Sequence, residues 1–178
     1  MYVEGVERVL RLVDTLAERD FEIEAIDIGG GFGADYESDK SPVALQYAGA
    51  ILPLLKDRVD AGLKIILEPG RTISANAGIL LTRAQYIKTS GERRFVICDA
   101  GMHTLIRPAL YEAFHFIWPA APGSSMVPPK RSQTVDLPGL VETDIVGPIC
   151  ESGDFLAKGR MMPPLKRGEL VAVFTDGV

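Results

Sequence analysis

Apolar side chains in the first eighty residues follow a helical period and a strand period in alternation. Within residues 3–18 they recur every three or four positions, which predicts an amphipathic helix. A short β-prone run, Ala25–Ile28, comes next and ends in clustered glycines. The pair then repeats: residues 42–58 predict a second helix, and the apolar run Leu63–Leu67 predicts a strand buried on both faces of a parallel sheet. Alternating helices and strands are typical of an α/β fold.

The period changes near residue 81, where short extended segments with partial apolar–polar alternation replace the helices. The expected elements are strands at 81–88, 94–98, 134–137, 143–150, 155–156 and 170–174, a short helix within 105–116, and a loop rich in Pro, Gly and Ser over 119–132. We therefore expect α/β plus β architecture, with an α/β part over 1–85 and a mainly β domain over 86–178.

The glycines after the first strand form a candidate phosphate-binding loop. Gly29, Gly30 and Gly31 can take backbone conformations with positive φ, so that their N–H groups face outward. Such a loop at the carboxyl end of a buried strand is a place where α/β proteins hold a phosphate. On this stretch alone, a tight strand-to-helix turn is the alternative.

The second strand runs into Glu68-Pro69-Gly70-Arg71, at the same edge of the predicted sheet. A carboxylate at the end of a buried strand is costly unless a positive group pairs with it, and a protonated ring nitrogen would serve for Glu68. A held phosphate beside a carboxylate for a pyridinium nitrogen is what pyridoxal phosphate requires. The two strand ends therefore predict a site for that cofactor.

A dinucleotide site is a weaker alternative for the glycine loop. Gly29, Gly31 and Ala34 fit the pattern G-x-G-x-x-A. The acidic residue expected about twenty positions later at a strand end is missing, because residues 50–55 are apolar and helical.

Composition indicates an ordinary globular protein. The 178 residues are 47% hydrophobic and 24% charged, enough for one domain or parts of two. The net charge of −5 gives no electrostatic support for a nucleic-acid partner. Prolines interrupt the longest uncharged stretch, so we expect no membrane span. Cys98 and Cys150 form no disulfide framework and no metal-type Cys/His spacing occurs, so we expect no metal and a reducing, cytoplasmic setting.

Four sequence blocks, in this order and spacing, resemble the diaminopimelate decarboxylases, pyridoxal phosphate enzymes of the alanine-racemase-like, fold-type III group. The blocks are IDIGGGFG, LEPGRTISANAG, DAGMHTLIRPALYEA and VGPICESGD, and the resemblance covers nearly the whole chain. It implies that residues 1–85 are the last βα units of a cofactor-binding TIM barrel and that 86–178 are an incomplete, mainly β C-terminal domain. It also implies a homodimer with a shared active site.

The resemblance implies a role for each matching residue. Pyridoxal 5′-phosphate would be held by Gly29, Gly30, Gly31, Glu68, Pro69, Gly70 and Arg71, with Glu68 on the pyridine nitrogen. The substrate would be bound by Arg71, Arg107, Tyr111 and Glu151, with Glu151 on the distant ammonium group. Cys150, contributed across the dimer interface, would donate the proton that replaces the lost CO₂.

These roles suit the chemistry of the side chains, but each residue has an ordinary structural alternative. An arginine fork matches a carboxylate, and a thiol can donate a proton near neutral pH. In isolation, however, Cys150 could be a small buried apolar residue, Arg107 a helix-start charge and Tyr111 a packed aromatic ring. The polar residues after Cys150, through Asp154, favour a surface loop there.

The lysine that such enzymes join to the cofactor as a Schiff base has no counterpart in this sequence, where no segment of the YA-x-KAN type occurs. We therefore expect a fragment of a longer or split enzyme, inactive alone. The expected reaction of the complete enzyme is the decarboxylation of meso-2,6-diaminopimelate to L-lysine and CO₂ in lysine biosynthesis. Glu151 and Arg107 favour this substrate. The alternatives are a related decarboxylase of ornithine, arginine or carboxynorspermidine, or an inactive relative that still binds pyridoxal phosphate.

Overall fold

A computed structural model describes residues 2–37 and 41–177, which fall into two compact units. The first unit lies within Met1–Gly33 and Pro42–Ile73, and the second within Ala34–Ser41 and Ser74–Val178. The division at residue 73 comes earlier than the expected boundary at 85. The reason is that residue 85 lies inside a strand whose two halves pair with different neighbours in the second unit.

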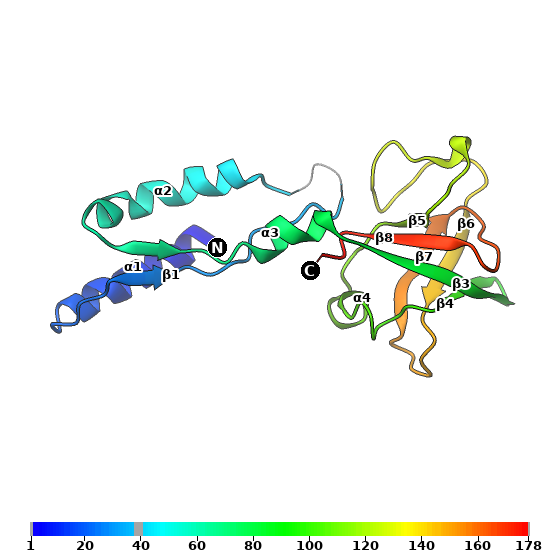
Figure 1. Cartoon of the computed structure of the whole chain (residues 1–178), viewed down its shortest axis with the longest axis horizontal. Helices are drawn as coiled ribbons and strands as arrows, with labels where there is room; N and C mark the ends of the chain where they lie inside the picture. Colours follow the sequence, from blue (N-terminus) through cyan, green and yellow to red (C-terminus); the bar gives the residue numbers. More distant parts are fainter. Residues whose placement is uncertain (1, 38–40, 178) are drawn as a thin grey trace. The chain divides into compact units, whose positions relative to one another are not determined.

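The first unit contains two helices and a pair of parallel strands. Its elements are α1 (Tyr2–Ala17), β1 (Ala25–Asp27), α2 (Ala44–Asp60) and β2 (Lys64–Ile66), followed by the short helix α3 (Gly70–Ser74) (Figure 1). The strands pair in parallel with Ile26 opposite Ile65. Their shared core consists of Val6, Ile26, Phe32, Ile51 and Leu55. The predicted order of helices and strands is confirmed here.

One expectation for the first unit is wrong. Leu63–Leu67 was expected to be buried on both faces, yet Ile66 is 49% exposed and Leu67 is 50% exposed. Among the described residues, β2 has β1 as its one partner strand, and the core forms on the face that carries Ile26 and Ile65. The opposite face of this two-stranded sheet, with Lys64 and Ile66, is open.

The second unit is mainly β, as expected. Its strands are β3 (Ile79–Ser90), β4 (Arg93–Cys98), β5 (Ile117–Pro119), β6 (Val141–Val146), β7 (Phe155–Met162) and β8 (Leu170–Phe174). They form one sheet in the order β5-β8-β3-β4-β6-β7, with β4 and β6 parallel and the other neighbours antiparallel (Figure 1). The short helices are η1 (Ala75–Ala77), α4 (Arg107–Tyr111) and η2 (Ser124–Met126).

Strand β3 gives this sheet its curvature, because its first half pairs with β8 and its second half with β4. The change occurs at a register shift between Ala84 and Tyr86. There the Asp99 carboxylate accepts hydrogen bonds from the Thr82 hydroxyl and the Arg83 N–H, at 2.6 and 2.8 Å. A bulge of this kind bends a strand, so the sheet curls around its own apolar core. That core includes Val96, Ile117, Ile145, Leu156 and Val173, all at most 1% exposed.

Candidate active site

The glycine loop after β1 has the backbone geometry of an anion-binding nest. Gly29 and Gly31 have φ of 70° and 80°, in the left-handed region that favours glycine. The Gly29 N–H donates to the Asp27 carboxylate at 2.8 Å. Within residues 2–37 and 41–177, the N–H groups of Gly30 and Gly31 form no hydrogen bond. These two donors are therefore available to a ligand.

The segment after β2 lies against this loop. The Glu68 N–H donates to the Gly29 carbonyl at 3.0 Å, and the Thr72 hydroxyl donates to the Gly33 carbonyl at 2.5 Å. The backbones approach so closely that a Cβ on Gly30 would collide with the Glu68 carbonyl oxygen. The structure thus brings together the two strand ends that the sequence singled out. The Glu68 side chain is exposed, however, because it lies at the open end of β2 rather than within a buried sheet.

In the second unit, Arg107 and Tyr111 begin and end α4. Pro108, in the first turn, is buried and anchors the helix, and Glu112 ends it with a left-handed φ of 52°. The Arg107 guanidinium carbon lies 5.6 Å from the centre of the Tyr111 ring, which is itself 65% exposed. Arg107 Nε is buried and has no partner within the described residues. Arg107 as a whole is only half-buried, and a guanidinium presents its N–H groups in a fork that matches a carboxylate.

Tyr36 is a neighbour of Arg107 that the sequence did not single out. The Arg107 guanidinium carbon lies 5.7 Å from the Tyr36 ring, and the same ring packs edge-on against His115 at 5.3 Å. The Tyr36 hydroxyl is buried without a partner in the described part of the chain. An aromatic residue in an otherwise polar loop was the available signal, but nothing in the sequence placed this loop beside α4.

Cys150 and Glu151 lie in the turn between β6 and β7, and both side chains are exposed. The Glu151 N–H donates to the Ile149 carbonyl at 2.9 Å, and the Glu151 carboxylate accepts from the Gly153 N–H at 3.2 Å. The expected surface loop is therefore present, and the alternative of a buried Cys150 does not hold for this chain. The cofactor-type residues lie in the first unit, whereas Arg107, Tyr111, Cys150 and Glu151 lie in the second.

The two cysteines differ in environment, which gives a simple prediction. Cys98 is fully buried at the end of β4, and this burial raises the pKa of its thiol to about 12. In the folded chain, iodoacetamide at about pH 8 should modify Cys150 and leave Cys98 unmodified, because the reagent attacks an accessible thiolate. Peptide mass spectrometry after alkylation measures this. Equal labelling of both thiols without denaturant would contradict the burial of Cys98.

His115 predicts a pH dependence of stability. Burial lowers the pKa of His115, with the cationic Arg107 and Arg160 adding to the shift and a hydrogen bond from Nδ1 to the Phe174 carbonyl opposing it. The unfolded chain binds a proton near the ordinary histidine pKa of about 6.5, and the folded chain resists it. The free energy of unfolding should therefore be highest above about pH 6.5 and should fall as the pH drops below it.

Urea unfolding followed by the fluorescence of Trp118, which is buried in the second unit, measures this effect at about pH 7 and about pH 5.5. His115→Gln should flatten the dependence, since glutamine can donate to Phe174 but does not titrate. His103→Gln, at an exposed position, is the control and should keep the slope of the parent chain. An unchanged slope in His115→Gln would assign the dependence to other groups.

The sequence comparisons assign this mainly β domain to a known family. Residues 10–177 match the model of the pyridoxal-dependent decarboxylase C-terminal sheet domain, so the chain belongs to the pyridoxal-dependent decarboxylases. Within that family, it is 44% identical over 176 residues to a diaminopimelate decarboxylase of Aquifex aeolicus. That alignment covers 99% of this chain and 38% of the relative, so the chain spans well under half of the relative's length.

Solved structures extend the comparison. A diaminopimelate decarboxylase of Helicobacter pylori, crystallised with L-lysine, is similar with a TM-score of 0.79 and 34% identity. The match covers 99% of this chain and 40% of that one. A lysine/ornithine decarboxylase of Vibrio vulnificus shares the fold with a TM-score of 0.78, but at 22% identity over 44% of its chain. Within the described residues, no helix is long and apolar enough to cross a membrane.

Proposed function

We propose that this chain is part of a diaminopimelate decarboxylase, which converts meso-2,6-diaminopimelate to L-lysine and CO₂ in lysine biosynthesis. The observation that carries the proposal is the match of 99% of the chain to enzymes of that name at up to 44% identity. The residues of the two units support it. The first unit offers N–H donors for an anion at Gly30 and Gly31, and the second offers the Cys150 thiol, the Glu151 carboxylate and the Arg107 guanidinium.

The first-unit residues fit pyridoxal phosphate. Gly30 and Gly31 present unpaired N–H groups for a phosphate. Glu68, whose carboxylate is exposed, is joined to the same loop by the hydrogen bond from its backbone N–H to the Gly29 carbonyl. The close approach at Gly30 leaves no room for a side chain between the two segments. Gly29–Gly31 together with Glu68–Arg71 would hold the cofactor, with Glu68 on its ring nitrogen. When bound, pyridoxal phosphate supplies the electron sink for the bond broken on loss of CO₂.

The second-unit residues fit a substrate that carries charges of both signs at both ends. Arg107 and Tyr111, with Arg71 from the first unit, bind substrate carboxylate, and Glu151 binds the distant ammonium group. Cys150 Sγ–H delivers the proton to the carbon that loses CO₂. A thiol on an exposed turn with a fixed backbone suits this role, because a proton donor must be held within reach of one face of that carbon.

We also propose the place of each unit in the complete enzyme. The parallel pair β1 and β2, joined through α2, supports the first unit as the last βα part of a TIM barrel, with the second unit as the β domain that follows. The lysine that joins the cofactor would come from sequence that matches the uncovered part of the relatives. The complete enzyme would be a cytoplasmic homodimer in which Cys150 and Glu151 reach the partner's active site.

A chimeric decarboxylase tests the function. In it, residues 1–178 replace the matching portion of the Aquifex aeolicus enzyme, and turnover is compared on meso-diaminopimelate, L-ornithine and L-arginine. We expect L-lysine formation from meso-diaminopimelate and little turnover of the other two. Preferential turnover of L-ornithine or L-arginine would point to the related decarboxylases instead. A folded chimera that binds pyridoxal phosphate but turns over none of the three would point to an inactive relative.

A further inference from the structure

Asp154 is a buried carboxylate that joins two loops of the second unit. Its side chain is 4% exposed. Oδ1 accepts a hydrogen bond from the Met102 N–H at 2.7 Å, and Oδ2 accepts one from the Ile149 N–H at 2.6 Å. Short bonds from N–H groups to a carboxylate are among the stronger hydrogen bonds in proteins. Within the described residues Asp154 forms no ion pair, so backbone amides balance its charge.

The backbone around Asp154 is shaped to admit the carboxylate. A Cβ on Gly101 or on Gly147 would collide with its oxygens, and neither glycine has a positive φ. Both positions therefore require glycine for space rather than for backbone conformation. The Asp154 main chain closes the same turn, since its carbonyl accepts from the Gly147 N–H and its N–H donates to the Glu151 carbonyl, both at 3.0 Å.

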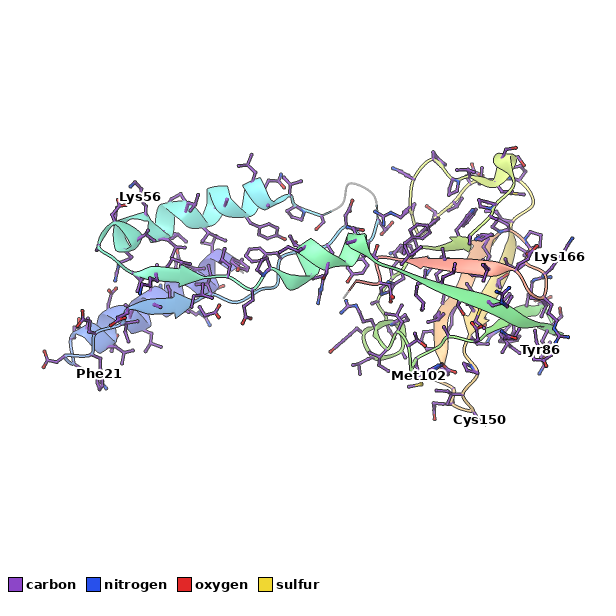
Figure 2. All side chains as sticks on the ribbon, in the orientation of Figure 1. Phe21, Lys56, Tyr86, Met102, Cys150 and Lys166 are labelled. Atoms are coloured by element: carbon purple, nitrogen blue, oxygen red, sulfur yellow. The ribbon has the colours of Figure 1, made fainter. Side chains whose placement is uncertain are left out.

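The two joined loops carry the residues assigned to substrate and proton transfer. Residues 147–154 form the turn that holds Cys150 and Glu151, whereas the loop at Met102 leads into α4 and Arg107. Figure 2 shows Met102 and Cys150 at the same end of the second unit. Cys150 itself is exposed, and Asp154 supplies the two short side-chain bonds that fix the turn and its neighbour.

We propose that Asp154 is a positioning residue: it ties the Cys150–Glu151 turn to the loop that leads into Arg107, and so sets where the thiol stands. The link to catalysis rests on the proposed function, but the tie between the loops does not. Both oxygens of Asp154 accept from N–H donors. An asparagine can supply one acceptor only, so Asp154→Asn leaves the N–H of Met102 or Ile149 without the acceptor that it has in the parent chain.

The first measurement uses the 178-residue chain itself and amide hydrogen exchange. In Asp154→Asn we expect exchange at Met102 or Ile149 to accelerate about tenfold or more, with exchange in β4 unchanged. Gly147→Ala should give the same local effect, because the new Cβ displaces the carboxylate. The matched controls are Asp144→Asn, whose carboxylate accepts from the Gly159 N–H, and Gly153→Ala, where a Cβ meets nothing closer than 3.9 Å. Both controls should keep the parent exchange at Met102 and Ile149.

The second measurement uses the chimeric enzyme and a double-mutant cycle. If Asp154 acts through Cys150, Asp154→Asn lowers kcat in the parent enzyme but not further in the Cys150→Ala background. If the losses of kcat from Asp154→Asn and Cys150→Ala are additive, Asp154 does not act through Cys150 and the positioning role is wrong. If exchange at Met102 and Ile149 in Asp154→Asn equals that of the parent chain, Asp154 does not tie the two loops together. A chimera without turnover on any substrate contradicts the proposed function alone, because the exchange data do not depend on activity.

Discussion

Cys150→Ala is expected to lower kcat of the chimeric enzyme on meso-diaminopimelate by about 100- to 10,000-fold, the range typical of a lost general acid. KM should change much less, because the proposed function gives the thiol a proton transfer and assigns substrate binding to Arg107 and Glu151. Cys150→Ser should lose nearly as much, since a hydroxyl is a far weaker acid than a thiol. Steady-state rates of L-lysine formation measure both variants.

The control for this prediction is Ser152→Ala, an exposed position in the same turn. It should retain the parent kcat, because its side chain forms no hydrogen bond in the described structure that fixes the turn. A Cys150→Ala variant with parent-like kcat would remove the thiol from the reaction and leave solvent or another side chain as the proton donor. A large loss in Ser152→Ala would instead indicate that the turn tolerates no change.

The helices α1, α2 and α4 and most strands were predictable because their signals are local, whereas the short helices α3, η1 and η2 were not predicted. The apolar stripe of α1 and the continuous apolar run at β2 need no long-range information. Strand β5 was missed because Ile117–Pro119 adjoins a proline-rich loop and pairs only at long range, with β8. The predicted strand at 134–137 does not form, although Val135 and Leu137 do pack against the core. Apolar character there reflects burial without strand pairing.

Candidate site residues could be picked out from the sequence where they stand in a short motif. They could not be picked out where their environment depends on contacts between distant segments. The glycine loop, Glu68–Arg71, Arg107 and Cys150 all stand in motifs that can be read directly. The sequence could not decide whether Cys150 was buried, and the structure separates it from Cys98 by exposure. Asp154 was grouped with a polar surface loop. Its burial depends on the space at Gly101 and Gly147, which single-sequence patterns do not reveal.

The wrong prediction for β2, whose one face is open, has a different cause. The sequence predicts a strand buried on both faces because Leu63–Leu67 is uniformly apolar, which is typical of an interior strand in a parallel sheet. In this chain one face packs on the helices and the other is exposed at Ile66. The apolar composition of β2 is thus typical of a larger sheet than the two-stranded one in this unit. The proposed cofactor-binding residues at the end of β2, Glu68–Arg71, should therefore be tested in the chimera.

Gly30→Ala is expected to have the second large effect, a loss of affinity for pyridoxal phosphate at the proposed cofactor-binding residues. The new Cβ would collide with the Glu68 carbonyl oxygen, a backbone atom that cannot rotate away as a flexible side chain can. Glu68 is held on both sides, since its N–H donates to the Gly29 carbonyl at 3.0 Å and its carbonyl accepts from the Gly70 N–H at 2.9 Å. The glycine loop and the Glu68 segment must therefore separate. Overpacking of this kind costs about 1–3 kcal/mol, so the affinity of the chimera for pyridoxal phosphate should fall about 5- to 150-fold.

Gly49→Ala provides the matched control, because Gly49 is exposed in α2 and a Cβ there meets nothing within 4 Å. It should leave cofactor affinity unchanged and stabilise the helix by up to about 1 kcal/mol, the usual gain for alanine over glycine within a helix. Spectroscopic titration of each apo-chimera with pyridoxal phosphate gives the affinities. A methyl group on Gly30 must move the glycine loop relative to the Glu68 segment. Parent-like affinity for pyridoxal phosphate in Gly30→Ala would therefore mean that these two segments do not hold the cofactor between them.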